Sequence, residues 1–337
     1  MDWFEKLTGF RETGYEETRS RLEVEGDRLR SRVNGVSYGV GELELVSLQA
    51  LRERVQSAGD LPGRLKASVV KGDVRHMHRS PENAGALFQV ASQFNLLEMT
   101  SQHVTPEDGV TRYQRDPTQG PACAIAAGAA TIYRNYFASV EGSQGQTATR
   151  QFNGLADLGA ALSSAMSLPV DNLWRMQNGY ALGTQSGLDA ISRHLETLAA
   201  DQIDILRGKL RIGVHRDVEV TEAAGPDRPL VSQSFCSALP VAYSSVPQAH
   251  WEPFALLVLE AAYEATMWAG VLNAQRGASN IVLLTLLGGG VFGNHKSWIH
   301  AAIRRALELM ASFDLDARLV SYGTPSEEIL AIVEKFR

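Results

Sequence analysis

The chain alternates between short apolar runs and segments rich in glycine, proline and aspartate. Apolar or β-branched runs of about four to eight residues favour buried strands. We predict strands at 65–74 (LKASVVKGDV), 85–92 (GALFQVAS), 210–220, 234–243, 280–287 and 318–322. Longer stretches in which apolar residues recur every three or four positions favour helices. We predict helices at 47–55, 121–137, 251–274, 295–313 and 326–336.

This alternation of helices and strands is typical of a layered α/β fold with a parallel or mixed sheet. The first 60 residues are charged and helix-prone, and residues 156–198 look mostly helical with a break at Pro169. Residues 105–120 (TPEDGVTRYQRDPTQG) are predicted to be a loop because of their proline, glycine and aspartate content. Pro121 then suits the first turn of a helix, where its missing N–H needs no partner.

Composition and charge narrow the class of protein. Of the 337 residues, 44% are hydrophobic and 21% are charged, which excludes a disordered, collagen-like or coiled-coil chain. The net charge of −6 argues against a broad nucleic-acid surface. Two cysteines make no disulfide framework, the N-terminal sequence lacks a signal-peptide pattern, and the most apolar run, 281–287, is too short to span a bilayer. We expect a cytoplasmic protein with no membrane contact.

A glycine-rich segment, 288–294 (GGGVFGN), lies between a predicted apolar strand and a predicted helix. Ligands of α/β proteins bind at the carboxyl ends of strands. Glycines let the backbone approach a ligand closely, and the following helix offers unpaired N–H groups to an anion. The segment is neither a P-loop nor a GxGxxG motif, so it indicates a phosphate- or diphosphate-binding loop of another kind.

Five segments together resemble the macrodomain superfamily, the ADP-ribose-binding fold. LTLLGGGVFGN (284–294) is similar to its second phosphate loop, VVKGDV (69–74) to its strand ending in Gly-Asp, and LFQVASQFN (87–95) to the next buried strand. QGPACAI (119–125) resembles the first ligand loop, and SFCSALPVAY (234–243) a Leu-Pro-containing strand. The segments occur in the family's order, and some features are near the poly(ADP-ribose) glycohydrolase branch. The strict Asn-Ala-Ala-Asn run is absent, and Thr118-Gln119-Gly120 stands where the first loop has three glycines.

The resemblance implies a three-layer α/β/α fold with a mixed sheet, and a ligand site for ADP-ribose. Asp73 would read adenine, Tyr322 would stack on it, and the two loops would cradle the diphosphate, with Phe292 beside the distal ribose. The implied ligand-binding residues are Asp73, Val74, Gln89, Gln119, Gly120, Pro121, Ala122, Cys123, Gly289, Gly290, Val291, Phe292, Gly293, Asn294 and Tyr322. No metal or cofactor is expected, and ADP-ribose is the ligand or product.

Hydrolysis of an ADP-ribosyl linkage needs a group that positions water or moves a proton near the distal ribose. The candidates near the first loop are Asn95, Glu98, Glu107 and Asp116. We predict an ADP-ribosylhydrolase that removes ADP-ribose from a modified protein or other macromolecule. Glu107 and Asp116 also fit plain turn residues, Glu98 fits a structural acceptor, and a buried Gln89 would need a partner for its amide.

Two other functions remain open on the sequence. The first is a module that binds ADP-ribose or a nucleotide without reacting. The second is a cysteine hydrolase in which Cys123, near a helix start, is the nucleophile and His215, His250 or His295 is the base.

Three further segments bear on the site or on the domain boundaries. We interpret His76 and His78 as surface or loop histidines and not as metal ligands, and 174–180 (WRMQNGY) as core packing, with a place beside the substrate as the alternative. The ligand motifs fall on both sides of 140–210. We therefore predict an N-terminal helical extension, 1–64, on one macrodomain-like domain, 65–337, interrupted by a helical insertion at about 140–210.

Overall fold

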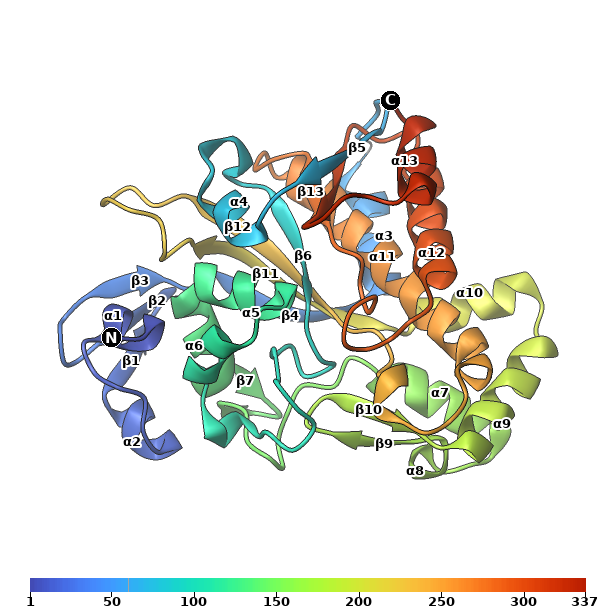
Figure 1. Cartoon of the computed structure of the whole chain (residues 1–337), viewed down its shortest axis with the longest axis horizontal. Helices are drawn as coiled ribbons and strands as arrows, with labels where there is room; N and C mark the ends of the chain where they lie inside the picture. Colours follow the sequence, from blue (N-terminus) through green and yellow to red (C-terminus); the bar gives the residue numbers. More distant parts are fainter. Residues whose placement is uncertain (60) are drawn as a thin grey trace.

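The computed structural model describes residues 1–59 and 61–337, and its centre is a seven-stranded sheet (Figure 1). The strand order is β4 (Glu42–Ser47), β11 (Arg211–Glu219), β12 (Leu230–Cys236), β6 (Leu87–Ala91), β13 (Ile281–Leu284), β14 (Asp316–Ser321) and β5 (Lys66–Lys71). Strands from β12 to β5 pair in parallel, whereas β11 is antiparallel to both of its neighbours. The sheet is therefore mixed, as predicted.

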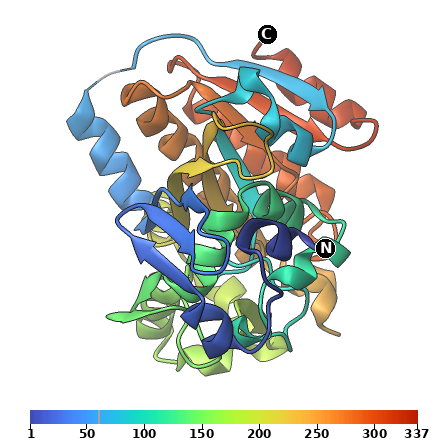
Figure 2. The same ribbon diagram turned by 90° about the vertical axis from the view of Figure 1, so that its left-hand side faces the viewer.

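Helices cover both faces of this sheet (Figures 1 and 2). One layer contains α3 (Leu48–Ala58), α11 (Glu252–Gln275), α12 (Lys296–Leu309) and α13 (Glu327–Glu334), and the other contains α4 (Val74–Arg79), α5 (Gln119–Ala126) and α6 (Gly128–Tyr136). Successive residues of β6 point to opposite layers, because Leu87 belongs to the core under α11 and Phe88 to the core under α5. The predicted three-layer α/β/α architecture is confirmed.

Helix α11 is the central element of its layer. Its length and hydropathy would suffice to cross a membrane, yet 78% of its most apolar 18-residue window is buried inside the protein. It contacts α12 and α3 and packs on the sheet. A helix that is apolar on all sides is expected where it is surrounded by the core of a large domain.

The N-terminal region differs from the predicted helical extension. After α1 (Trp3–Thr8) and α2 (Tyr15–Ser20), it forms a three-stranded sheet of β1 (Leu22–Glu25), β2 (Arg28–Ser31) and β3 (Ser37–Gly39), which packs against α5 and α6. Strand β4 belongs to the central sheet itself. The strands were missed because charged residues alternate with apolar ones, as in Arg28-Leu29-Arg30, which raises the local charge while one face is still buried.

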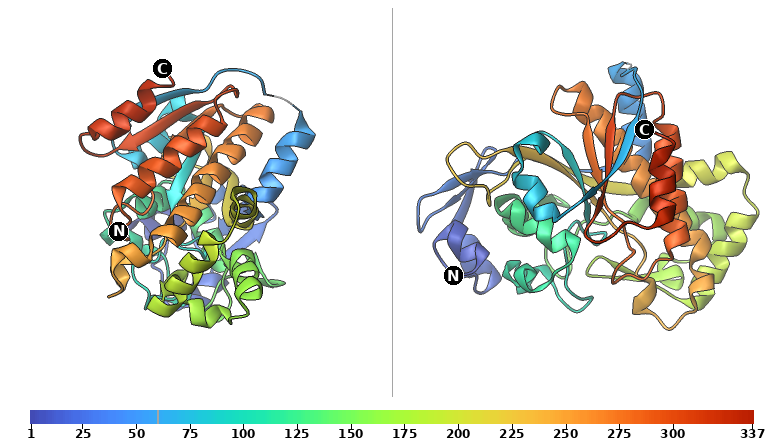
Figure 3. Two further views of the ribbon diagram at one scale, coloured as in Figure 1. Left: turned by 90° about the vertical axis from the view of Figure 1, so that its right-hand side faces the viewer. Right: turned by 45° about the horizontal axis from the view of Figure 1, so that its top comes forward.

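The region of the predicted insertion contains a β-hairpin that was not predicted from the sequence (labelled in Figure 1; Figure 3 gives two further views). Its elements are β7 (Ser139–Val140), β8 (Ser143–Gln144), α7 (Ala156–Met166), α8 (Val170–Leu173), β9 (Trp174–Gln177), β10 (Tyr180–Gly183), α9 (Gln185–Glu196) and α10 (Ala200–Gly208). The turn between β9 and β10 is Asn178-Gly179, and both residues have positive φ (46° and 79°). This pair is typical of a two-residue hairpin turn. Trp174 packs on Phe254, as core packing requires, but Tyr180 faces a cavity described below.

Most predicted elements differ from the structure in their bounds, and two of them also differ in kind or continuity. The predicted strand 234–243 is β12, which ends at Cys236 and is followed by a 3₁₀ turn, Val241–Tyr243. The predicted helix 121–137 starts earlier, at Gln119, and is split at Ala127 into α5 and α6. Further 3₁₀ turns lie at Pro81–Asn83, Pro106–Asp108, Thr111–Arg115 and Gln248–His250.

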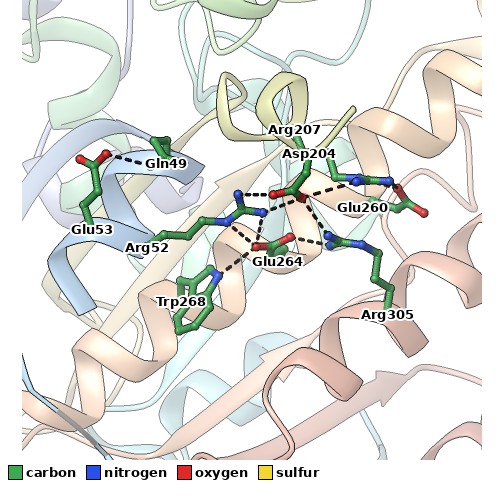
Figure 4. A network of polar contacts seen from close by, with 9 residues as sticks. All are labelled: Gln49, Arg52, Glu53, Asp204, Arg207, Glu260, Glu264, Trp268 and Arg305. Carbon is green, nitrogen blue, oxygen red and sulfur yellow. Dashed lines mark hydrogen bonds and ion pairs between the residues drawn. The ribbon is translucent and has the colours of Figure 1, made fainter. Parts of the chain in front are cut away.

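An ion-pair network joins the insertion to the core helices (Figure 4). Asp204 of α10 accepts hydrogen bonds from Arg52 of α3 and Arg305 of α12. Both arginines also donate to Glu264 of α11, which is buried. These contacts link α10, from the predicted insertion, to α3, α11 and α12.

Candidate functional site

Two adjoining cavities lie at the carboxyl ends of the parallel strands. The inner cavity, of about 210 Å³, lies between Glu98 and Phe292, and the outer cavity, of about 420 Å³, lies between Asp73 and Tyr322. Four residues line both: Asp116, Thr118, Gln119 and Thr285. The two cavities therefore form one cleft, placed where ligands of open α/β sheets bind.

The outer cavity is formed where β5 and β14 end. Asp73 caps α4, and its Oδ1 accepts a hydrogen bond from the Arg75 N–H at 2.8 Å. Arg75 itself is paired with Glu222. The Tyr322 side chain follows β14 and is 85% exposed, so its ring faces are open to a ligand. Val74, Gln119 and Ala122 complete this wall, so five of the implied ligand-binding residues are brought together here.

Helix α5 begins directly against the end of β6. The Gln119 side-chain amide accepts a hydrogen bond from the Ala91 N–H and donates one to the Gln89 carbonyl. These two bonds fix the start of α5 to the backbone of β6. A Cβ at Gly120 would lie 2.0 Å from the Ala91 carbonyl oxygen, so only glycine allows this approach. The start of α5 thus reaches the inner cavity, with Gly120 and Pro121 in its wall.

The glycine-rich loop closes the opposite side of the cleft. Gly288 has positive φ, and the Asn294 amide donates to the Leu239 carbonyl, which fixes the end of the loop. Among the described residues, the backbone N–H groups of Gly290, Val291 and Phe292 have no hydrogen-bond acceptor. Successive free N–H groups in a loop before a helix form a site for an anion.

Glu98 lies in the wall of the inner cavity and is 2% exposed. The Arg134 Nη2 donates to both of its carboxylate oxygens, at 2.9 and 3.1 Å. Burial raises the pKa of Glu98 to about 7, and this effect exceeds the opposing effect of Arg134. A carboxyl group with a pKa near neutrality can both donate and accept a proton at physiological pH.

Three aromatic rings from separate segments line the inner cavity. Tyr180, Tyr243 and Phe292 contact one another, with centroid separations of 5.1 to 5.6 Å. The Tyr180 hydroxyl donates to the Met99 carbonyl at 2.7 Å, next to Glu98. Tyr243 was not among the predicted site residues, and Tyr180 was included only through the alternative that 174–180 lies beside the substrate. The hairpin signal Asn178-Gly179 could have placed Tyr180 on a strand.

Several candidates lie outside both cavities. Asn95 is fully buried and is hydrogen-bonded to Gln151 and the Leu97 N–H, and Glu107 accepts from the Ala148 N–H. Gln89 is also buried, but its Oε1 accepts from the N–H of Thr285 in the cleft wall. Of the glycine-loop residues, Gly290, Val291 and Phe292 line the inner cavity, whereas Gly289, Gly293 and Asn294 do not. Of the four catalytic candidates, the structure brings only Glu98 and Asp116 into the cleft.

The cysteine-hydrolase interpretation is contradicted. Cys123 is fully buried, and burial raises the pKa of its thiol well above the ordinary value, so the reactive thiolate is disfavoured. The three histidines proposed as its base have other surroundings. His215 is buried in the core, His250 pairs with Asp189, and the His295 side chain caps the N-terminus of α12. Cys123 is therefore a core residue behind the ligand loop and does not line the cleft.

The interpretation of His78 as a surface or loop histidine is also wrong. Its ring is fully buried, stacks on Phe88 and contacts the Val74 carbonyl through Nδ1. Burial lowers the pKa of His78 to about 4, so the ring is neutral. In the part of the chain that the structure describes, no three His, Cys, Asp or Glu side chains form a metal-binding group.

The fold and the cleft define an α/β/α protein with a mixed seven-stranded sheet and a cleft at the carboxyl ends of its parallel strands. No family model and no curated protein sequence matches the chain. The structure is similar to poly(ADP-ribose) glycohydrolase from Deinococcus radiodurans in complex with ADP-ribose, with 13% identity, a TM-score of 0.45, and coverage of 87% of this chain and 92% of that one. It is also similar to poly(ADP-ribose) glycohydrolase from Thermomonospora curvata, with 12% identity, a TM-score of 0.45, and coverage of 92% and 94%.

Proposed function

We propose that the cleft binds ADP-ribose and that the protein hydrolyses an ADP-ribosyl linkage on a modified macromolecule. The outer cavity takes the adenosine, with Asp73 near the adenine and Tyr322 on its face. The free N–H groups of the glycine-rich loop take the diphosphate, and the inner cavity takes the distal ribose.

One observation carries the catalytic part of this proposal: a buried carboxyl group, Glu98, in the wall of the cavity at the far end from Asp73. A protonated carboxyl can protonate the leaving oxygen of a glycosidic bond, and a carboxylate can take a proton from water. The aromatic rings make part of the wall of the same cavity apolar, which favours the uncharged, proton-donating form of Glu98.

In the proposed reaction, Glu98 donates its proton to the leaving oxygen as the bond between that oxygen and C1 of the distal ribose breaks. Water then forms a bond to the same carbon and gives its proton to the Glu98 carboxylate. The products are free ADP-ribose and the unmodified hydroxyl group (or carboxyl group, for an acidic-residue linkage), and Glu98 ends in its starting state. Arg134 acts as a positioning residue, because its Nη2 holds both carboxylate oxygens.

The test has two measurements on the same protein. Isothermal titration with ADP-ribose measures binding, and release of ADP-ribose from an ADP-ribosylated protein measures turnover. We expect both in the wild type. Absence of binding at high micromolar ADP-ribose would overturn the whole proposal, whereas binding without release from serine-, acidic-residue- and polymer-linked substrates would make the protein a non-catalytic ADP-ribose module.

Cys123→Ser is the control for a thiol mechanism. Because Cys123 does not line the cleft, we expect the variant to keep turnover within about twofold of the wild type once the protein is folded. Loss of turnover with intact ADP-ribose binding would assign the chemistry to the thiol instead of Glu98.

A further inference from the structure

A third cavity, of about 330 Å³, lies beside the cleft on the side of α12 and α13. Its floor is apolar and includes Ile299, Leu319 and Ile329. Its polar lining comes from the start of α12, the end of β14 and the start of α13, and consists of Lys296, His300, Ser321, Thr324 and Ser326. We refer to it as the side cavity.

The side cavity adjoins the cleft at two places. Leu286 and Gly290 line both the side cavity and the inner cavity, and Val320 lines both the side cavity and the outer cavity. A Cβ at Gly290 would have no atom within 4 Å, so this wall is thin. The side cavity therefore adjoins the cleft between the adenosine and the diphosphate positions, which is where the adenosine ribose would lie.

Two basic side chains of the side cavity lack partners. Lys296 is exposed and makes no ion pair with any described residue. It is the first residue of α12, a helix with no acidic residue in its first turn, so its charge opposes the helix dipole. His300 is 8% exposed, and its ring nitrogens make no hydrogen bond within the described residues. Burial lowers the pKa of His300, which disfavours the charged form of its ring.

The charged groups around His300 are mostly basic, so the surroundings of the side cavity carry an excess of positive charge. Lys296, Arg304 and His295 are basic, and Glu328 of α13 is acidic. The Glu328 carboxylate is hydrogen-bonded to its own backbone N–H and to Ser326, which holds the pKa of Glu328 below the ordinary value. An internal anion thus already occupies the start of α13, so a ligand anion would depend on Lys296 and His300.

We propose that the side cavity binds a phosphate monoester on the adenosine ribose, so that the protein prefers ADP-ribose bearing a 2′- or 3′-phosphate to ADP-ribose itself. This inference rests on the proposed function, because it requires the adenosine to lie in the outer cavity. An ammonium and an imidazole in the polar part of the lining, Lys296 and His300, suit a compact dianion. Hydrogen bonds to a charged group contribute enough for roughly a tenfold or larger preference.

The experiment compares ADP-ribose with its 2′-phospho and 3′-phospho forms by isothermal titration at constant ionic strength. We expect one phosphorylated form to bind about tenfold or more tightly, and the form that does so identifies the hydroxyl. Lys296→Met and His300→Gln should each reduce this preference severalfold and leave the affinity for ADP-ribose unchanged. Arg304→Met, on the same helix but outside the cavity lining, is the matched control and should retain the preference.

Glu328→Gln tests the same cavity in the opposite direction. Removing the competing anion should increase the preference for the phosphorylated form. Equal or weaker binding of both phosphorylated forms, with ADP-ribose still bound, overturns this inference alone. Equal loss of both affinities in Lys296→Met also overturns it, because the lysine would then serve the diphosphate. Absence of ADP-ribose binding in the wild type overturns the proposed function instead.

Discussion

Two buried glutamates in this protein, Glu98 and Glu264, differ in the number of their hydrogen-bond donors and in whether they line a cavity. Glu98 and Glu264 are each 2% exposed, and each accepts hydrogen bonds from arginine. Glu264 is held by two arginines and by the Trp268 indole N–H, and it lines no cavity among those that the structure describes (Figure 4). Glu98 has one arginine partner and lies in the wall of the inner cavity.

Under the proposed function, the difference separates a structural carboxylate from a catalytic one. A buried charge whose oxygens are all engaged by fixed donors stabilises one arrangement of its neighbours. A buried carboxyl with one partner and an open side has a pKa set mainly by desolvation, and it can reach a ligand. Glu264 therefore joins α3, α11 and α12, whereas Glu98 is available for proton transfer in the cleft.

The largest expected effect is on turnover in Glu98→Gln. Removing a general acid–base group lowers the rate roughly 10²- to 10⁴-fold. The amide keeps the shape of the side chain and one acceptor for Arg134, so ADP-ribose affinity should change less than about threefold. Release of ADP-ribose and isothermal titration on one preparation check both statements. Turnover within threefold of the wild type would show that Glu98 is not the general acid–base group.

The second expected effect is on stability in Glu264→Gln. Breaking a buried ion pair costs about 3–5 kcal/mol, and we expect the lower end because Arg52 and Arg305 keep Asp204 as a partner. Urea unfolding measures the change in the free energy of unfolding. Turnover per folded molecule should match that of the wild type. A large loss of turnover at wild-type stability would show that the two glutamates do not differ in the way we infer.

The third expected effect is a pH dependence specific to Glu98. Because the pKa of Glu98 is raised to about 7, its proton-donating form is lost as the pH rises through 7. Above that pH, kcat should therefore decrease, with a slope that approaches tenfold for each pH unit. The free energy of unfolding should also decrease as the pH rises from about 4.5 to about 7. In this range the folded chain holds the Glu98 proton more tightly than the unfolded chain does. Burial of Glu98 therefore costs most above pH 7. Glu264→Gln should retain the wild-type pH profile, whereas a flat profile in the wild type would contradict the assignment.

The central sheet and the glycine-rich loop could be predicted from the sequence more completely than the inner cavity could. Runs such as 85–92 and 280–287 are apolar on both faces because helices cover both sides of the sheet, and this pattern is visible without coordinates. Asp73 and the glycine-rich loop come directly after such strands, so their common edge follows from the parallel order.

The inner cavity could not be assembled in this way, because its walls come from distant segments. Whether Glu98 faces a ligand or the core depends on Arg134, 36 residues later, and on the turn after β6. Asn95 and Glu98 are equally plausible on sequence, yet Asn95 is engaged by Gln151. Tyr180 reaches the cavity because the insertion folds back over it. Contacts of this range are set by tertiary packing and leave no local pattern.

The smallest expected effect concerns the link between this insertion and Glu98. The Tyr180 hydroxyl donates to the Met99 carbonyl and accepts from the Gln93 amide, both in the segment that holds Glu98. Tyr180→Phe keeps the aromatic wall but removes these bonds, which costs about 1 kcal/mol in the free energy of unfolding. If the hairpin positions Glu98, kcat should fall severalfold while the affinity for ADP-ribose stays unchanged. A fall in stability with unchanged kcat would show that Tyr180, like Glu264, only holds the fold together.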